Sequence, residues 1–416
     1  MREELLQKGA LARDAAFKLA CIDTVLKNRA LSAIADALSA HSDEIIEENK
    51  KDIAAAEEKG TRKAMIDRLT LTPERIAGIA DGVRKVIELP DPIGETVKEW
   101  TRPNGLLISE KRVPMGVIAI IYEARPNVTV DAAALCLKSS NAVMLRGGSE
   151  AIHSNIKLMR IMQDAAYAAG LPEGSLNLIE DTDRAAAVEL MKMNGYVDLL
   201  IPRGGAALIR SVVENATVPV IETAAGNCHI YADRDCDFDM AISIILNAKV
   251  SRPSVCNAAE TLLIDRAIAD KFLPLAADAL KKAGVELRGC PECVKILPDI
   301  NKAAESDWST EYNDYIMAIK IVDGVSEAIA HINKYNTKHS EAIITNNSET
   351  AEKFLREVDA AAVYVNASTR FTDGFEFGFG AEIGISTQKM HARGPMGLEQ
   401  LTSIKYIVHG NGQIRE

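Results

Sequence analysis

The chain has 416 residues, a length that predicts two or three domains, and 47% of them are hydrophobic, which suits a globular protein with a sizeable core. Its 59 acidic and 48 basic residues give a formal net charge of −11, which argues against a general nucleic-acid or membrane-surface binder. No apolar signal region opens the chain, and no stretch approaches the roughly 20 apolar residues of a membrane span. Seven cysteines, an odd number scattered through a long chain, favour a reduced, cytoplasmic setting.

Helical periodicity dominates the N-terminal region, where apolar residues recur at helical spacing within residues 1–60. A further helix is predicted over 73–86, with Thr72 as its N-cap. The next segment, 97–112, has two strand-like arms around Asn104-Gly105, which predicts a hairpin. Because both arms are polar, we expect this hairpin to leave the domain body and pair elsewhere.

Strand and helix patterns alternate from residue 113 to residue 221, which is typical of a parallel sheet covered by helices. The predicted strands are 117–122, 142–145, 175–179, 197–201 and 218–221, and the predicted helices are 129–137, 150–169, 184–193 and 206–215.

A second α/β stretch follows. Its predicted strands are 261–264, 319–322, 341–345 and 362–366, and its predicted helices are 267–283, 325–335 and 349–358. The tract 371–397 is too apolar for a linker and too rich in glycine for regular structure, so we expect an ordered loop near a site. One more strand is predicted over 402–408.

Two glycine turns each follow a predicted strand and open a helix: Arg146-Gly147-Gly148-Ser149 and Arg203-Gly204-Gly205. Glycines at the carboxyl end of a parallel strand let a phosphate approach the backbone N–H groups of the next helix. Neither turn matches a phosphate-binding fingerprint, and each by itself could be an ordinary strand-to-helix turn. Two such turns that precede Cys256 in the chain favour a dinucleotide-binding site.

Cys256 lies in the segment 251–258 between an apolar run and a strand-like run. We interpret it as a nucleophile beside a dinucleotide, which points to acyl chemistry through a thioester coupled to hydride transfer. The alternative is a small buried hydrophobe, the commonest role of a cysteine outside a disulfide.

The other cysteines carry weaker signals. Cys21 and Cys136 lie in helical stretches and are predicted to be core residues, while Cys228 and Cys236 flank a strand-like run. The pair Cys290-Pro291-Glu292-Cys293 is half of a zinc motif without a second half, so we interpret it as a surface turn with two thiols.

Three charged residues have two interpretations each. Glu222 follows the last strand of the alternating block, where it is either catalytic or a cap. Arg125 and Arg252 each precede a proline, and either could pair with an anionic substrate or form a surface salt bridge.

Taken together, these residues resemble the aldehyde dehydrogenase superfamily and, within it, the reductases of L-glutamyl 5-phosphate. Two strings are specific: Tyr122-Glu123-Ala124-Arg125-Pro126 and Arg252-Pro253-Ser254-Val255-Cys256-Asn257. The resemblance spans essentially the whole chain, through the segments 113–118, 121–129, 141–150, 201–205, 220–223, 251–260, 369–374 and 382–387.

The resemblance implies an aldehyde-dehydrogenase-like α/β fold. Residues 1–96 and 113–252 would form a doubly wound dinucleotide-binding domain, and 253–385 an α/β catalytic domain. The hairpin 97–112 and the C-terminal strand within 386–416 would form an oligomerisation element, so a homo-oligomer is expected.

It also implies the NADPH-dependent reduction of L-glutamyl 5-phosphate to L-glutamate 5-semialdehyde in proline biosynthesis, with no metal. The Cys256 thiolate would displace phosphate to give a thioester, which hydride converts to a thiohemiacetal and then to the aldehyde. The oxyanion would be held by the backbone N–H of Cys256 or by Asn127. The superfamily's oxyanion asparagine falls on Ala124 in this chain, so Asn127 is an imperfect match.

The remaining implied site residues bind cofactor or substrate. Glu222 aligns with the superfamily's hydrolytic base, which a reductase does not need, so it is grouped with the cofactor residues. Arg146 and Ser149 would hold the 2′-phosphate of NADPH. The cofactor set is Arg146, Gly147, Gly148, Ser149, Arg203, Gly204, Gly205, Glu222 and Glu311, and the substrate set is Arg125, Arg252 and Arg370.

Two other functions stay open at this point: an oxidising semialdehyde dehydrogenase of the same fold, and a non-catalytic dinucleotide-binding scaffold. No kinase domain is recognised in this chain, so a separate glutamate 5-kinase would supply the acyl phosphate. A transient complex with that kinase is therefore expected.

Overall fold

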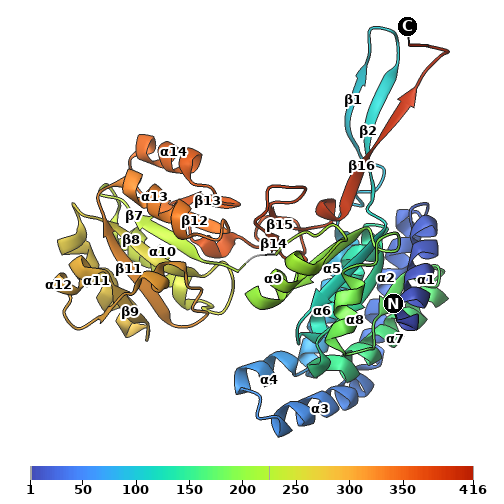
Figure 1. The fold of residues 1–416 in the computed structure, drawn as a ribbon, viewed down its shortest axis with the longest axis horizontal. Coiled ribbons are helices and arrows are strands. Elements are labelled where there is room, and N and C mark those ends of the chain that lie inside the picture. The colour runs from blue at the N-terminus through green and yellow to red at the C-terminus, as the bar shows by residue number, and fades with distance from the viewer. Residues whose placement is uncertain (1, 224, 416) are drawn as a thin grey trace. The chain divides into compact units, whose positions relative to one another are not determined.

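The computed structural model describes residues 2–223 and 225–415, which divide into two compact units (Figure 1). The first comprises 1–223, 378–384 and 396–416, and the second comprises 224–377 and 385–395. The predicted boundary at residue 252 lies too far along the chain. Strand β7 (Cys228–Ala232) is an interior strand of the second unit's sheet, and helix α10 (Phe238–Val250) packs in that unit's core.

The first unit is built on a four-stranded parallel sheet of order β5-β4-β3-β6. These strands are β3 (Val117–Tyr122), β4 (Ala142–Arg146), β5 (Leu176–Leu178) and β6 (Leu199–Arg203). Nearly every residue in them is buried, as a sheet covered by helices on both faces requires. The strand order reverses between β3 and β6, which is where doubly wound sheets bind ligands.

The predicted fifth strand, 218–221, is wrong. Only Val220 makes a bridge, to Leu200, outside any regular strand. Pro219 interrupts this segment, and proline has no N–H to donate to a ladder.

Helices of the first unit follow the predicted periodicity. In α5 (Pro73–Glu88) the buried residues Ile76, Ile79 and Val83 recur at helical spacing, and the Thr72 side chain accepts from the N–H of Arg75, so the predicted N-cap is confirmed. The others are α1 (Glu3–Leu19), α2 (Thr24–Ala40), α3 (Ser42–Glu58), α4 (Lys63–Leu69), α6 (Pro126–Lys138), α7 (Ile152–Ala168), α8 (Arg184–Leu190) and α9 (Ala206–Asn215).

A separate three-stranded antiparallel sheet confirms the predicted hairpin. Strands β1 (Thr96–Thr101) and β2 (Leu107–Pro114) pair around the Asn104-Gly105 turn. The predicted C-terminal strand, β16 (Thr402–His409), pairs along the whole of β2.

The second unit holds a seven-stranded parallel sheet of order β10-β9-β11-β8-β7-β12-β13. Its α10, α11 and α12 pack into one apolar cluster and its α13 and α14 into another. The bounds are β8 (Ala259–Asp265), β9 (Glu286–Gly289), β10 (Asn301–Lys302), β11 (Ile316–Val322), β12 (Ser340–Ile344), β13 (Ala362–Val365), α11 (Ala269–Lys282), α12 (Pro291–Ile296), α13 (Val325–Tyr335) and α14 (Ser348–Glu357).

The glycine-rich tract 371–397 contains only the two-residue strands β14 (Ile385–Ser386) and β15 (Gly394–Pro395), as expected for a loop without regular structure. Within the described residues, no helix is both long and apolar enough to cross a membrane.

Candidate active site

Cys256 lies in the turn between α10 and β8, and its side chain is half-buried. Its backbone carbonyl accepts a hydrogen bond from the thiol of Cys228 at 3.2 Å. Gly226 approaches the same carbonyl so closely that a Cβ at that position would overlap the Cys256 backbone. Gly226 and the first residue of β7, Cys228, therefore fix the peptide that carries the candidate nucleophile.

Asn257 clamps this turn to the segment 369–372. Its side-chain amide donates to the carbonyls of Arg370 at 3.2 Å and Thr372 at 3.0 Å. Its own carbonyl accepts from the hydroxyl of Thr369 at 2.7 Å. Because Asn257 and Thr369 are buried, water does not compete for these bonds.

The guanidinium of Arg370 lies beside the Cys256 turn. Its Nε donates to the Ser251 hydroxyl at 3.1 Å, and its Nη1 donates to the side-chain oxygen of Asn257. Burial lowers the pKa of Arg370, the neighbouring Arg252 lowers it further, and Asp373 and Cys256 act in the opposite sense. An arginine stays charged at neutral pH even so, and this positive charge suits an anionic substrate.

Two of the three predicted substrate arginines, Arg252 and Arg370, thus belong to one cluster. The third, Arg125, is exposed in the first unit, at the N-cap of α6. Asn127 is in the first turn of that helix, and its amide donates to Asp131 at 3.0 Å. Burial raises the pKa of Asp131 to about 6, against the opposing effects of Asn127 and Arg203.

The predicted glycine turns lie at the carboxyl ends of β4 and β6. Gly205 is the N-cap of α9 and has no side chain to occupy the first-turn amides. At Gly204 a Cβ would lie 2.6 Å from Cδ of Glu123, which follows β3, and both glycines are exposed. Open amides at the switch point of a doubly wound sheet are the arrangement that binds a pyrophosphate, so these residues fit a dinucleotide.

Around β4, Gly147 is buried, Gly148 is half-buried and Ser149 is exposed. Arg146 is itself buried, and its Nη2 donates to the carbonyls of Thr182 at 2.7 Å and Asp183 at 3.3 Å. Burial lowers the pKa of Arg146, partly offset by Glu150 and Asp181. Its buried Nε has no hydrogen-bond partner among the described residues.

The two predicted glutamates are both half-buried. Glu311 accepts a hydrogen bond from the backbone N–H of Gly226 at 2.8 Å, which links it to the glycine that packs on Cys256. Glu222 precedes Thr223, the last residue of the first unit's long N-terminal segment.

Sequence reasoning missed Gly226, Cys228 and the clamping role of Asn257. Asn257 lies in the string 252–257 that is specific to the family, so the sequence marked its position. No sequence pattern marks Gly226 or Cys228, because their contacts with Cys256 join residues about 30 positions apart through the sheet.

Two predictions about cysteines are wrong. Cys290 and Cys293 do not form a surface turn: both are buried, with sulfurs 3.5 Å apart, because α12 packs into the apolar cluster of the second unit. Cys21 is exposed in the turn after α1, while Cys136 is buried as predicted. The described residues contain no group of three or more His, Cys, Asp or Glu side chains placed to hold a metal ion.

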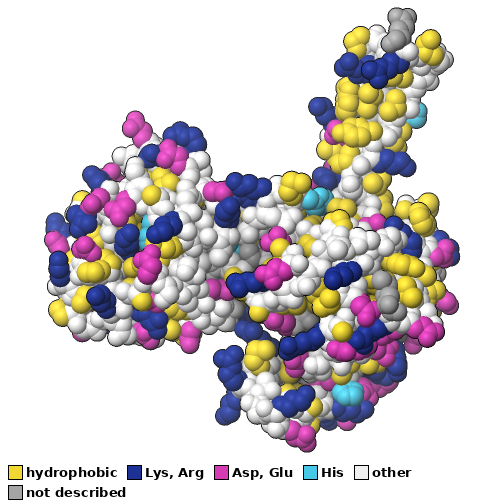
Figure 2. Space-filling view, viewed as in Figure 1, with side chains coloured by type: hydrophobic (Ala, Val, Ile, Leu, Met, Phe, Trp, Pro, Cys, Tyr) yellow, Lys and Arg dark blue, Asp and Glu magenta, His cyan; other side chains and the backbone are white. Residues whose placement is uncertain are grey.

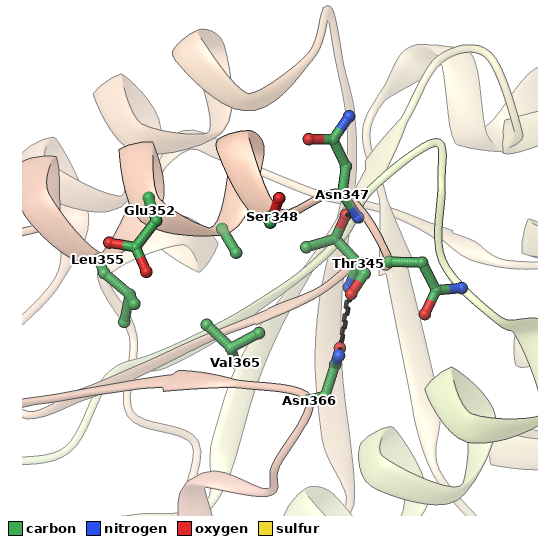
Figure 3. Close-up of a pocket in the computed structure, with 9 residues that line it drawn as sticks. Thr345, Asn347, Ser348, Glu352, Leu355, Val365 and Asn366 are labelled. Atoms are coloured by element: carbon green, nitrogen blue, oxygen red, sulfur yellow. Dashed lines mark hydrogen bonds between the residues drawn. The ribbon is translucent and has the colours of Figure 1, made fainter.

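A hollow opens at the carboxyl ends of β12 and β13, beside the start of α14 (Figure 3). Two of its polar residues satisfy each other: Asn366 accepts from the N–H of Thr345 at 2.9 Å and donates to its carbonyl at 2.9 Å. Among the described residues, its lining includes none of the predicted site residues, so we assign it no role in the reaction.

Comparison with known proteins identifies the family. The model of the aldehyde dehydrogenase family matches residues 10–314 and 296–407. A curated gamma-glutamyl phosphate reductase of Clostridium perfringens is 61% identical over 415 residues, covering 100% of both chains. One from Moorella thermoacetica is 60% identical over 413 residues, covering 99% of both. The crystal structure of gamma-glutamyl phosphate reductase from Thermotoga maritima superposes with a TM-score of 0.98 at 50% identity, over 100% of both chains. The chain belongs to the aldehyde dehydrogenase family and, within it, to the gamma-glutamyl phosphate reductases.

Proposed function

We propose that this chain reduces L-glutamyl 5-phosphate to L-glutamate 5-semialdehyde, with release of phosphate, in proline biosynthesis. The observation that carries the proposal is the fixed Cys256 turn, whose Asn257 accepts from Arg370, in a chain 61% identical to a curated reductase of this name. Family members use a nicotinamide dinucleotide, and the glycine turns after β4 and β6 fit one.

The chemistry follows from a thiolate facing an acyl phosphate. The Cys256 sulfur forms a bond to the acyl carbon, the bond from that carbon to the phosphate oxygen breaks, and phosphate leaves with the electron pair. When bound, the reduced dinucleotide supplies the hydride that reduces the resulting thioester. The carbon–sulfur bond then breaks, which frees the aldehyde and regenerates the thiolate. The backbone N–H of Cys256 is the candidate donor to the oxyanion, with Asn127 as a weaker one.

Arg370 and Arg252 are the proposed binding groups for the substrate's phosphate or carboxylate, with Arg125 as a third. Two guanidinium groups, one on the Cys256 turn and one beside it, give an anion both charge and forked hydrogen bonds. Arg252 lowers the pKa of Arg370, so the two positive charges are close enough to repel each other. Such a pair of cations favours an anion bound between them, which supports the proposal.

We further propose NADPH as the preferred cofactor, with Arg146 and Ser149 holding its 2′-phosphate. The buried Nε of Arg146 that has no partner among the described residues supports this role. In Arg146→Ala, fluorescence titration should show NADPH binding weakened by about tenfold and NADH binding unchanged. Equal weakening of both would contradict the 2′-phosphate assignment.

The three-stranded sheet is the proposed oligomerisation element. Figure 2 shows apolar side chains gathered over it, and its exposed residues include Val97, Ile404, Tyr406 and Val408. A monomeric protein rarely leaves such a patch in water. Sedimentation velocity should give a homo-oligomer that Tyr406→Glu dissociates. A monomeric parent chain would refute this.

A separate glutamate 5-kinase is the proposed source of the acyl phosphate, through a transient complex. Direct transfer would limit hydrolysis of a labile intermediate. In a coupled assay with kinase, ATP and glutamate, we add a reagent that consumes free acyl phosphate. The rate of semialdehyde formation should then stay nearly unchanged. Complete inhibition by this reagent would show release into solution instead.

The reaction itself is tested in reverse. The protein is mixed with glutamate 5-semialdehyde, NADP⁺ and phosphate, and NADPH is followed by absorbance beside Cys256→Ala. Phosphate-dependent NADPH formation that the variant lacks supports the proposal. Formation without phosphate would mean that water resolves the thioester, which favours an oxidising dehydrogenase. No signal in either condition would favour the scaffold.

A further inference from the structure

Cys228, the first residue of β7, is a buried thiol to which the proposed reaction gives no chemical step. Its sulfur lies 3.2 Å from the Cys256 carbonyl oxygen and 3.9 Å from Nδ1 of His339. Burial, followed by the charge of Glu341, raises the pKa of Cys228 well above its ordinary value. The group therefore remains S–H at neutral pH and acts as a hydrogen-bond donor rather than as a nucleophile.

A chain of polar contacts, through His339, Ser340 and Thr372, leads from Cys228 back to the Cys256 turn. Nδ1 of His339 lies 2.8 Å from the Ser340 hydroxyl, which donates to the Thr372 hydroxyl at 2.7 Å. The Thr372 carbonyl accepts from the side chain of Asn257 at 3.0 Å. The peptide between residues 256 and 257 is therefore gripped at its carbonyl by Cys228 and at the next side chain by the segment 369–372.

The grip at the carbonyl determines the direction of the thiol. Gly226 closes one side of that carbonyl, and the S–H of Cys228 donates to its oxygen. If this peptide rotated, ψ of Cys256 would change, and Sγ would move relative to Arg370, which is hydrogen-bonded to the next residue, Asn257. A displacement of about 1 Å at a reacting atom costs up to 100-fold in rate.

We propose that Cys228 is a positioning residue for the nucleophile: its S–H holds the Cys256 carbonyl so that the catalytic sulfur faces the acyl carbon. This inference rests on the proposed function. Its effect falls on the chemical step, because the contact involves the nucleophile's backbone and not the substrate. The expected signature is a lower kcat with an unchanged KM.

Three variants test the proposal. Cys228→Ala removes the donor, and Cys228→Ser retains a donor of similar size. Cys136→Ala is the matched control, because it removes an equally buried thiol from α6 in the first unit. Steady-state kinetics of the reverse reaction and thermal unfolding are measured for each. Alkylation of Cys256 by iodoacetamide is followed by peptide mass spectrometry, with the exposed Cys21 as internal reference.

Cys228→Ala should lower kcat by about five- to tenfold, the value of one hydrogen bond, and leave KM within about twofold. In this variant Cys256 should be alkylated more slowly relative to Cys21, because its thiolate moves away from Arg370 and is less stabilised by that positive charge. Cys228→Ser should recover most of both losses. Cys136→Ala should retain the wild-type kcat with a comparable loss of thermal stability.

Wild-type kcat and wild-type alkylation of Cys256 in Cys228→Ala would overturn the proposal. Equal losses in the Ala and Ser variants would also overturn it, because packing alone would then explain them. If the parent protein lacks reductase activity, the proposed function fails, while the alkylation ratio still decides whether Cys228 controls the reactivity of Cys256.

Discussion

The two units build their candidate sites from different materials. In the first unit the proposed dinucleotide-binding edge is made of backbone: glycine turns follow two parallel strands, and no side chain caps the amides at the start of α9. In the second unit the Cys256 turn is held by side chains, through Cys228, Asn257 and the segment 369–372. A backbone site tolerates many surrounding sequences, whereas a side-chain site depends on a few exact neighbours. Mutations should therefore harm the second unit's site more than the first.

The largest effect is expected at Gly226, which packs directly on the backbone of Cys256. In Gly226→Ala the new Cβ must displace the Cys256 carbonyl, so kcat should fall by about 100-fold or more, in line with a misplaced nucleophile. Gly78→Ala is the control, since a Cβ there meets nothing within 4 Å in α5. Wild-type kinetics in Gly226→Ala would show that the Cys256 turn tolerates the added Cβ. The second unit's site would then be no more sensitive to mutation than the first unit's.

The next effect is expected at Arg370. Arg370→Gln removes a charged partner for the anion, so KM for phosphate in the reverse reaction should rise by about twentyfold, as for a lost charge-assisted hydrogen bond. Arg266→Gln, which breaks an exposed pair with Asp323 in the same unit, should leave KM unchanged. An unchanged KM in Arg370→Gln would assign the arginine to clamping the turn rather than to substrate.

A buried histidine should make the second unit sensitive to acid. Burial lowers the pKa of His331 from 6.5 to about 3, and His229, Lys320 and Lys334 act in the same sense. As the pH falls, His331 is protonated in the unfolded chain near pH 6.5 and in the folded chain only near pH 3. Stability is therefore retained above pH 6.5 and lost as pH falls toward 3. Between pH 7.5 and 5.5 the free energy of unfolding should fall by about 1.3 kcal/mol through this group.

The fluorescence of Trp308, whose ring lies 5.4 Å from that of His331, reports the transition in urea. In His331→Phe the pH dependence over this range should shrink by the same amount. Identical slopes in the two proteins would show that the ring titrates normally in the folded state.

The smallest effect is expected in the first unit. Gly204→Ala places a Cβ against Cδ of Glu123 at 2.6 Å and Cδ2 of Leu208 at 2.8 Å. Both are ends of flexible side chains that can move aside, so dinucleotide binding should weaken by only about threefold. A loss as large as that in Gly226→Ala would show that the two sites are equally demanding.

Local patterns were sufficient for most of the elements. Strand β3, helices α9 and α13 and the Asn104-Gly105 hairpin begin and end at or near the predicted residues, since each depends on periodicity and turn chemistry. The boundary at 252 was wrong because β7 joins its sheet through strands made later in the chain.

The candidate site divides in the same way. Cys256 and the glycine turns stood out from sequence alone, because their neighbours in the chain mark them. Gly226 and Cys228 did not, because their roles exist only where β7 meets the turn before β8. Likewise, nothing near Cys290 indicates that α12 buries both of its thiols.

The pairing of β16 with β2 has a consequence for biosynthesis. Arg112 and Thr402, whose side chains contact each other in this sheet, are 290 residues apart. During synthesis the β1–β2 hairpin emerges from the ribosome long before β16, the third strand of its sheet. Until then β2 presents a bare hydrogen-bonding edge, the feature that invites aggregation or capture by a chaperone. The three-stranded sheet is thus the last part of the first unit that a nascent chain can complete.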